Sequence, residues 1–304
     1  MGAALSQQAP PRRHSIILGA GHYRAELKGV EPFDKAGHPR RMLRLFIFGL
    51  GYTASHIARD LGKQGWSIIS TGSSGSIAFD DAASVRLGLQ GATHILSSVP
   101  PLVDGDPVLQ HYGDAVRTAA ENGTWVGYLS STGVYGDTGG AWVDESAPIK
   151  GRRGSRNDAD LDWQALGARV FRLPGIYGPG RSVLDRIKEG KAHRIDLADQ
   201  VFSRIHVEDI VSGVIAGFNG PAGVYNLADD RPCSQNAVVE FGCDLLGCPY
   251  PPLNSIEEAG LTPMARAFYA ENRRVANGKA KRLLGWHPRY ADYRLGLAAC
   301  YAAG

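Results

Sequence analysis

The stretch LFIFGLGYTASHIARDL, residues 45–61, constrains this chain more than any other. Its first four residues are apolar and predict a buried strand, and apolar residues at helical spacing from Ala54 onward predict an amphipathic helix. The spacing G-x-G-x-x-A, formed by Gly49, Gly51 and Ala54, stands where strand turns into helix. The sequence therefore predicts a tight turn between two packed elements.

A strand, turn and helix with this spacing suit the diphosphate of a dinucleotide. Gly49 allows the tight turn, Gly51 lacks the Cβ that would block a ligand, and Ala54 lets helix and strand pack closely. The helix N-terminus adds free N–H donors and partial positive charge. Such a motif also occurs in plain loops, but its position between strand and helix favours dinucleotide binding. The expected contacts are Gly49, Gly51, Tyr52, Thr53 and Ala54.

Length and composition bound the remaining possibilities. A chain of 304 residues, 43% of them hydrophobic, can bury roughly three quarters of its unfolded surface in one large domain or two packed ones. The four cysteines lack metal-ligand or disulfide spacing, and no apolar run is long enough to span a membrane. We therefore expect a cytoplasmic protein without a metal site or a membrane partner.

Residues 1–41 differ from the rest of the chain. They carry seven Lys or Arg against three acidic residues, a formal charge of +4, whereas the other residues sum to −1. They are polar, are interrupted by Gly and Pro, and lack sustained periodicity, so we expect a disordered leader. A targeting peptide or an artefact of start-site choice are the alternatives. The rest of the chain has no basic excess, so nucleic acid is not expected as a partner.

Further strands alternate with helices after the Gly-rich turn. Segments at 66–71, 93–99 and 125–129 are strand-like, and residues 107–122 have helical spacing. This alternation predicts an α/β fold with a doubly wound parallel sheet, which binds ligands at the carboxyl ends of its strands. The side chains expected at those ends are Thr71, Ser73, Ser74, Ser97, Ser98 and Val99.

The second strand ends in GSSGS at 72–76. A dinucleotide site usually has an acidic residue here to bind the ribose 2′-OH, and this loop has none. A hydroxyl-rich loop without a carboxylate can accept a 2′-phosphate, so we expect NADP to be preferred over NAD. A merely flexible serine turn explains the same residues equally well.

Later segments follow one another in a recognisable order. They are SSTGVYG at 130–136, RLPGIYGPGR at 172–181, RIHVEDI at 204–210, GVYNLADDRPCS at 223–234 and VANGKAKRLLGW at 275–286. Together they resemble the signature segments of the extended short-chain dehydrogenase/reductase superfamily, in its NAD-dependent epimerase/dehydratase branch. The resemblance covers residue 42 to about residue 300.

The resemblance implies a division of the chain. A Rossmann dinucleotide-binding core takes residues 42–177 plus 201–227, and a smaller C-terminal substrate lobe takes 178–200 plus 228–304. It also adds three residues after a core strand to the cofactor site: Pro174, Gly175 and Ile176.

The resemblance also locates the expected chemistry. The family has a Ser or Thr four residues before the tyrosine of the VYG segment that hydrogen-bonds the substrate; here it is Ser131, with Thr132 beside it. The family's acid/base is a tyrosine in Y-x-x-x-K, and residues 137–169 contain no tyrosine. Counting back from a helix expected at 157–166, the corresponding positions are Arg152 and Arg156, which makes this an atypical member. The resemblance thus gives Ser131, Thr132, Arg152 and Arg156 as catalytic-site residues.

Arginine cannot take over the role of that tyrosine. A guanidinium stays protonated at physiological pH and cannot accept a proton, but it binds a carboxylate or phosphate through two parallel hydrogen bonds. We therefore expect Arg152 and Arg156 to hold an anion from one side of a helix, if the helix begins there. A solvated basic loop at 151–156 is the simpler alternative.

Two functions remain in competition. The first is an NAD(P)-dependent oxidoreductase or epimerase/dehydratase-like enzyme for a small anionic metabolite, with its proton carrier unidentified. The second is a non-catalytic NAD(P)-binding sensor or regulatory protein, which the missing tyrosine favours. A small molecule is the expected partner, and a homodimer is left open. Tyr135, Tyr177 and His206 are expected to be structural.

Overall fold

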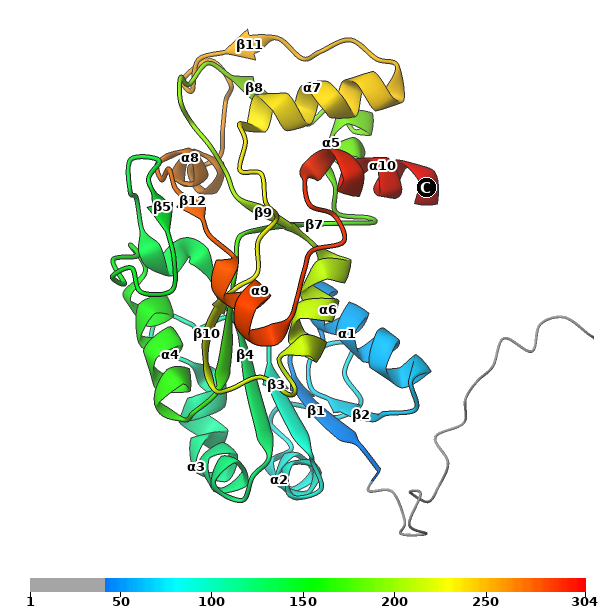
Figure 1. The fold of residues 1–304 in the computed structure, drawn as a ribbon, viewed down its shortest axis with the longest axis vertical. Coiled ribbons are helices and arrows are strands. Elements are labelled where there is room, and N and C mark those ends of the chain that lie inside the picture. Colours follow the sequence, from blue (N-terminus) through cyan, green and yellow to red (C-terminus); the bar gives the residue numbers. More distant parts are fainter. Residues whose placement is uncertain (1–41) are drawn as a thin grey trace, which may run out of the picture. The chain divides into compact units, whose positions relative to one another are not determined.

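A six-stranded parallel sheet lies at the centre of the computed structural model, which describes residues 42–304 (Figure 1). The expectation for residues 1–41 falls outside the described residues. The strands lie in the order β10-β6-β4-β3-β1-β2, and every neighbouring pair is parallel, which confirms the expected α/β class. Their bounds are β1 (Arg44–Phe48), β2 (Ser67–Ser70), β3 (His94–Ser97), β4 (Trp125–Ser131), β6 (Arg169–Leu173) and β10 (Gly223–Asn226).

The chain changes direction across the sheet at β1. Phe46 of β1 pairs with Ile69 of β2 on one side and with Ile95 of β3 on the other. The later strands β4, β6 and β10 continue outward beyond β3. The carboxyl ends of β1 and β3 therefore flank the point where the strand order reverses, which is where sheets of this kind bind ligands.

Helices cover both faces of the sheet, and β1 contributes to both cores because successive side chains point to opposite faces. Leu45 and Ile47 pack with α1 (Tyr52–Lys63), α6 (Val207–Ala216) and α9 (Gly278–Leu284). Phe46 and Phe48 pack with α2 (Ala82–Gln90), α3 (Pro107–Glu121) and α4 (Gly154–Ala165). The fold is thus a three-layer arrangement of helices, sheet and helices (Figure 1).

The remaining elements gather beyond the carboxyl ends of the sheet strands (Figure 1). A separate apolar cluster joins α5 (Val183–Lys188), α7 (Gln235–Leu246) and α10 (Tyr293–Ala303). Other elements there are β8 (Arg194–Ile195), β11 (Leu253–Asn254) and α8 (Pro263–Tyr269), and the pairs β7 (Gly175–Tyr177) with β9 (Arg204–His206) and β5 (Trp142–Val143) with β12 (Arg274–Val275). Residues 42–304 form a single compact unit. Within them, no helix is both long and apolar enough to cross a bilayer.

Candidate functional site

The turn between β1 and α1 has the geometry that its glycines predict. Gly49 has φ +81°, and a Cβ there would lie 2.8 Å from Cγ2 of Val99, so a side chain is excluded by both backbone and packing. Gly51 is the N-cap of α1, and a Cβ there would meet no atom within 4 Å. The protein itself therefore does not require glycine at Gly51; the open space in front of the helix fits an approaching diphosphate.

Two of the expected cofactor residues hold this turn from within the protein. The Gly49 N–H donates to Oγ1 of Thr71 at 3.1 Å, and the Leu50 N–H donates to the Thr71 carbonyl at 2.8 Å. Oγ of Ser98 donates to the Gly49 carbonyl at 2.5 Å. Thr71 and Ser98 thus fix the shape of the turn.

The other predicted residues near the strand ends differ in accessibility. Ser73 and Ser74 are exposed after β2, where a ribose could reach them. Ser97 is fully buried with its hydroxyl unpartnered, so the surface contact expected of it has no access. Ile176 lies in β7 and is partly buried against the core.

The N-terminus of α1 is free of a side-chain cap and has an arginine close by. Gly51 supplies no cap, so the first N–H groups of the helix, from Tyr52 onward, are left for an external acceptor. The Tyr52 hydroxyl donates to the Pro179 carbonyl at 3.0 Å, and Cζ of Arg181 lies 5.4 Å from the Tyr52 ring centroid. The helix dipole and this guanidinium both favour an anion here.

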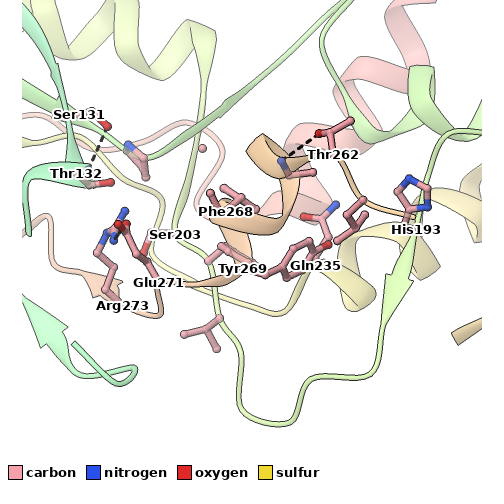
Figure 2. A pocket seen from close by; sticks show the side chains of 18 of the residues that line it. Ser131, Thr132, His193, Ser203, Gln235, Thr262, Phe268, Tyr269, Glu271 and Arg273 are labelled. Atoms are coloured by element: carbon pink, nitrogen blue, oxygen red, sulfur yellow. Dashed lines mark hydrogen bonds and ion pairs between the residues drawn. The ribbon is translucent and has the colours of Figure 1, made fainter. Parts of the chain in front are cut away.

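A cavity of about 1070 Å³ opens beyond the sheet (Figure 2). The ends of β4 and β6 contribute Ser131, Thr132, Pro174 and Gly175 to its lining. Its described lining residues include a single carboxylate, that of Glu271. The arginines are Arg152, Arg153, Arg156, Arg181, Arg186 and Arg273. This excess of cations favours an anionic ligand.

Ser131 and Thr132 lie where β4 passes into the 3-10 turn η1 (Thr132–Tyr135). Oγ of Ser131 accepts a hydrogen bond from the Gly133 N–H at 3.1 Å, which leaves its own hydrogen available for donation into the cavity. Thr132 is buried. The structure thus brings the predicted hydroxyl donor to the cavity wall.

Arg152 and Arg156 both line the cavity, but not for the expected reason. Helix α4 has Arg153 as N-cap and begins at Gly154, so Arg152 precedes the helix and the two arginines are not a helical i, i+4 pair. Arg152 points instead toward the segment around α8: its Nε donates to Oε1 of Glu271 at 2.6 Å. The shared helix face was expected only if the helix began at Arg152, and this condition is not met, because α4 begins two residues after Arg152.

Glu271 is held by two arginines at once. Besides Arg152, Nη1 of Arg273 donates to its Oε2 at 2.5 Å, and the same Nη1 donates to the Gly136 carbonyl at 2.7 Å. Burial raises the pKa of Glu271, but the hydrogen bonds from Arg152 and Arg273 outweigh burial and hold the pKa below its usual value. Glu271 is therefore a carboxylate at neutral pH and not a general acid.

The tyrosines and the histidine that the sequence assigns to structure do have structural contacts. The Tyr135 hydroxyl donates to Oδ1 of Asn226 at 2.8 Å, and Tyr177 is buried. Nδ1 of His206 accepts from the Glu208 N–H at the start of α6, and burial lowers the His206 pKa to about 4. These three groups are not placed in the cavity lining.

Several lining residues were missed by sequence reasoning. They are Arg181, Arg186, His193, Phe268, Tyr269, Glu271 and Arg273. Arg181 ends the segment RLPGIYGPGR at 172–181, which carries part of the family resemblance, so its positive charge could have indicated a cavity residue. The stretch AFYAENRR at 267–274 mixes aromatic and charged residues, which is unusual for a plain surface loop, but it matches no motif.

No protein-family model matches the chain. Over 144 residues it is 28% identical to a 3-diazoavenalumate denitrifying reductase from a Streptomyces species, a match that covers 43% of this chain. The chain thus spans about half, 46%, of that reductase.

Solved structures cover far more of the chain. A conserved protein of unknown function from Silicibacter pomeroyi is 42% identical, covering 86% of this chain and 99% of that one, with a TM-score of 0.76. A human epimerase family protein solved with NADPH is 16% identical, with 86% and 99% covered and a TM-score of 0.69. A dTDP-glucose 4,6-dehydratase from Bacillus anthracis solved with NAD is 16% identical, with 86% and 96% covered and a TM-score of 0.67.

Proposed function

We propose that the chain, which shares the fold of these epimerase and dehydratase structures, belongs to the extended short-chain dehydrogenase/reductase superfamily, in its NAD-dependent epimerase/dehydratase family, and that it is an NAD(P)-dependent oxidoreductase or epimerase/dehydratase-like enzyme for a small anionic metabolite. The observation that carries the proposal is the cavity that holds six arginines and one carboxylate beside Ser131. A bound nicotinamide would supply hydride chemistry. The residues of this chain bind and orient the substrate.

The lining residues of the cavity have different roles in the proposed reaction. The Ser131 hydroxyl donates a hydrogen bond to a substrate oxygen, and the arginines hold an anionic group at a fixed distance from it. Tyr269 is the tyrosine among the described lining residues, and burial raises its pKa. It therefore stays protonated at neutral pH and can donate a hydrogen bond, but it is a poor base.

The cofactor part of the proposal is NADP in preference to NAD. The loop at 72–76 contains no carboxylate that would repel a 2′-phosphate, and Ser73 and Ser74 are exposed there. The related structures were solved with either NADPH or NAD, so the preference rests on this loop alone.

Titration calorimetry with NADP and NAD tests the cofactor site. Wild type should bind NADP more tightly, and Gly51→Asp should bind neither, because the carboxylate would occupy the open space in front of α1. Tighter binding of NAD would overturn the preference, and binding of neither by wild type would overturn the site. Consumption of NADPH in the presence of carboxylate and phosphate metabolites then tests the enzyme proposal.

A non-catalytic dinucleotide-binding sensor is the second candidate. The observation that favours it is that Arg152, at the position expected for the family's tyrosine, is already paired with Glu271. A sensor should bind NADP but consume no NADPH with any metabolite.

A further inference from the structure

We propose that Glu271 occupies the subsite of a substrate carboxylate in the unliganded protein, and that this substrate is a planar aromatic or conjugated carboxylate whose body lies against Phe268. The inference rests on the proposed function of the same cavity and names the class of its substrate. It joins two features that lie side by side in the wall: a carboxylate between two arginines, and an accessible aromatic face (Figure 2).

The first feature is a site built for one carboxylate group. Arg152 and Arg273 come from separate segments and each donates to a different oxygen of Glu271, at 2.6 and 2.5 Å. The carboxylate between them is only 12% exposed. Two guanidinium groups directed at the two oxygens of one carboxylate form the arrangement that a bound substrate carboxylate needs.

The internal occupant of this site can be exchanged. The Arg152 side chain is 55% exposed, and an ion pair with a partner so open to water contributes little to stability. The second pair, between Arg273 and Glu271, is 17% and 12% exposed and joins residues two positions apart on the same segment. Glu271 also bears the single negative charge among the described lining residues, so an incoming anion is repelled by no other carboxylate there. An incoming carboxylate would replace Glu271 on the same donors, so the two arginines would remain paired with one carboxylate.

The second feature is an aromatic face beside this site. Phe202 and Phe268 are stacked with centroids 4.3 Å apart at an interplanar angle of 6°, and Tyr269 meets both rings edge-on. Phe268 is nevertheless 50% exposed and lines the cavity, so one side of the stack is open to a ligand. An open aromatic face stabilises a planar apolar group by offset or edge contacts.

A hydrogen bond places the carboxylate site close to the aromatic face. Nη2 of Arg152 donates to the carbonyl of Ala267 at 2.8 Å, and Phe268 is the next residue in α8. In Figure 2, Phe268 and Tyr269 lie between the Glu271 and Arg273 side chains on one side and His193 on the other. A carboxylate held by Arg152 thus has its attached carbon skeleton next to Phe268, and Figure 2 shows Ser131 on the same side of the view as Glu271 and Arg273.

The test uses binding of simple probes to the full chain by titration calorimetry. The planar probe is cinnamate, the non-planar match is cyclohexanecarboxylate, and the phosphate probes are inorganic phosphate and uridine diphosphate. Wild type should bind cinnamate more tightly than any of the others. Glu271→Gln should tighten cinnamate binding by about fivefold, the largest effect expected from freeing the Arg152–Glu271 pair, whose arginine is exposed. Phe268→Ala should abolish the preference for cinnamate over cyclohexanecarboxylate.

Controls separate this inference from other effects. Glu257→Gln removes a carboxylate that does not line the cavity and should leave all affinities unchanged. Glu271→Asp keeps the charge but shortens the side chain, so it should give a smaller gain and serves if the Gln variant does not fold. Melting temperature and NADP affinity report on the integrity of each variant.

Several outcomes would overturn the inference. Unchanged or weaker cinnamate binding in Glu271→Gln would show that Glu271 only orients the arginines. Equal binding of cinnamate and cyclohexanecarboxylate by wild type would contradict the proposed contact of a planar group with Phe268. Tighter binding of either phosphate probe than of cinnamate would indicate a phosphorylated substrate instead. Because the probes require no turnover, failure of the enzyme proposal would appear separately, as lost NADP binding or as no NADPH consumption with bound carboxylates.

Discussion

Asp160 and Arg172 form an ion pair that is closed to solvent. The two residues meet in a bidentate arrangement, with Nη2 of Arg172 2.7 Å from Oδ1 of Asp160 and Nε 3.1 Å from Oδ2. Their side chains are 0% and 2% exposed, respectively. Oδ2 of Asp160 also accepts from Oγ of Ser130 at 2.6 Å, so the pair ties α4 and β6 to the strand end that presents Ser131.

Asp160→Ala should strongly destabilise the protein. Removing one member of a buried pair leaves the Arg172 charge uncompensated, at a typical cost of about 3–5 kcal/mol. The free energy of unfolding from urea titration of both proteins measures the effect. Asp158→Ala, at an exposed position on the same helix, is the control and should change stability little. A loss below about 1 kcal/mol for Asp160→Ala would contradict the importance of the pair.

Gly49→Ala and Gly51→Ala should separate stability from binding. At Gly49 an added Cβ meets Val99 in a left-handed backbone, so we expect a loss of about 1–3 kcal/mol in the free energy of unfolding. At Gly51 the added Cβ meets no protein atom, so stability should fall by no more than about 1 kcal/mol, the cost of alanine at an N-cap, while dinucleotide affinity falls. Thermal melts and calorimetry on both variants measure the two effects. Unimpaired dinucleotide binding by Gly51→Ala would count against the site.

Asp229→Asn should remove a pH-dependent loss of stability. Burial raises the Asp229 pKa to about 8, and Oδ2 has no partner while Oδ1 accepts from the Arg231 N–H. Between an unfolded pKa near 4 and this folded value, only the unfolded state loses the proton, so the contribution of Asp229 to stability declines as pH rises. The melting temperature of the variant relative to that of wild type should therefore increase steadily from pH 5 to pH 8. A difference independent of pH would show that Asp229 is ionised in the folded protein.

Arg152→Lys should weaken binding of anionic ligands without altering the shape of a pH–rate profile. Lysine keeps the charge but loses the planar fork that reaches both Glu271 and the Ala267 carbonyl, and neither side chain exchanges protons near neutral pH. Affinity for anionic probes and the pH dependence of turnover are the two measurements. Arg152→Tyr should not restore a normal family enzyme, since Arg156 is not the lysine that would lower the phenol's pKa. A shifted pH profile at constant affinity would assign Arg152 a role in proton transfer.

Most strands of the sheet and the helix α3 were predicted from the sequence. The predicted segments at 66–71, 93–99 and 125–129 contain β2 and β3 and most of β4, and the helix predicted at 107–122 is α3 at 107–121, because buried strands and amphipathic helices have distinct apolar periods. Helix α4 begins earlier than predicted, at Gly154, and its N-cap makes no side-chain hydrogen bond, so the sequence lacked the usual start signal.

The cavity was predictable only in part. The family resemblance assigned Ser131, Arg152 and Arg156 to one site, and all three line the same cavity in the structure. The opposite wall, from Gly260 to Val275, was not predicted, because the bond between Arg152 and Glu271 joins residues 119 positions apart. A contact of that range leaves no periodic signal in the sequence, and the segment matches no motif.

The hydrogen bonds that Thr71 and Ser98 make to Gly49 have a kinetic consequence for the cofactor site. Both polar backbone groups of Gly49 are already engaged by the protein, so a diphosphate has the N–H groups from Tyr52 onward as its backbone donors. The turn is ordered when the chain folds, and encounter with a dinucleotide requires no loop closure. Capture of the cofactor should therefore be a single bimolecular step whose rate falls with ionic strength, without a slower isomerisation after it.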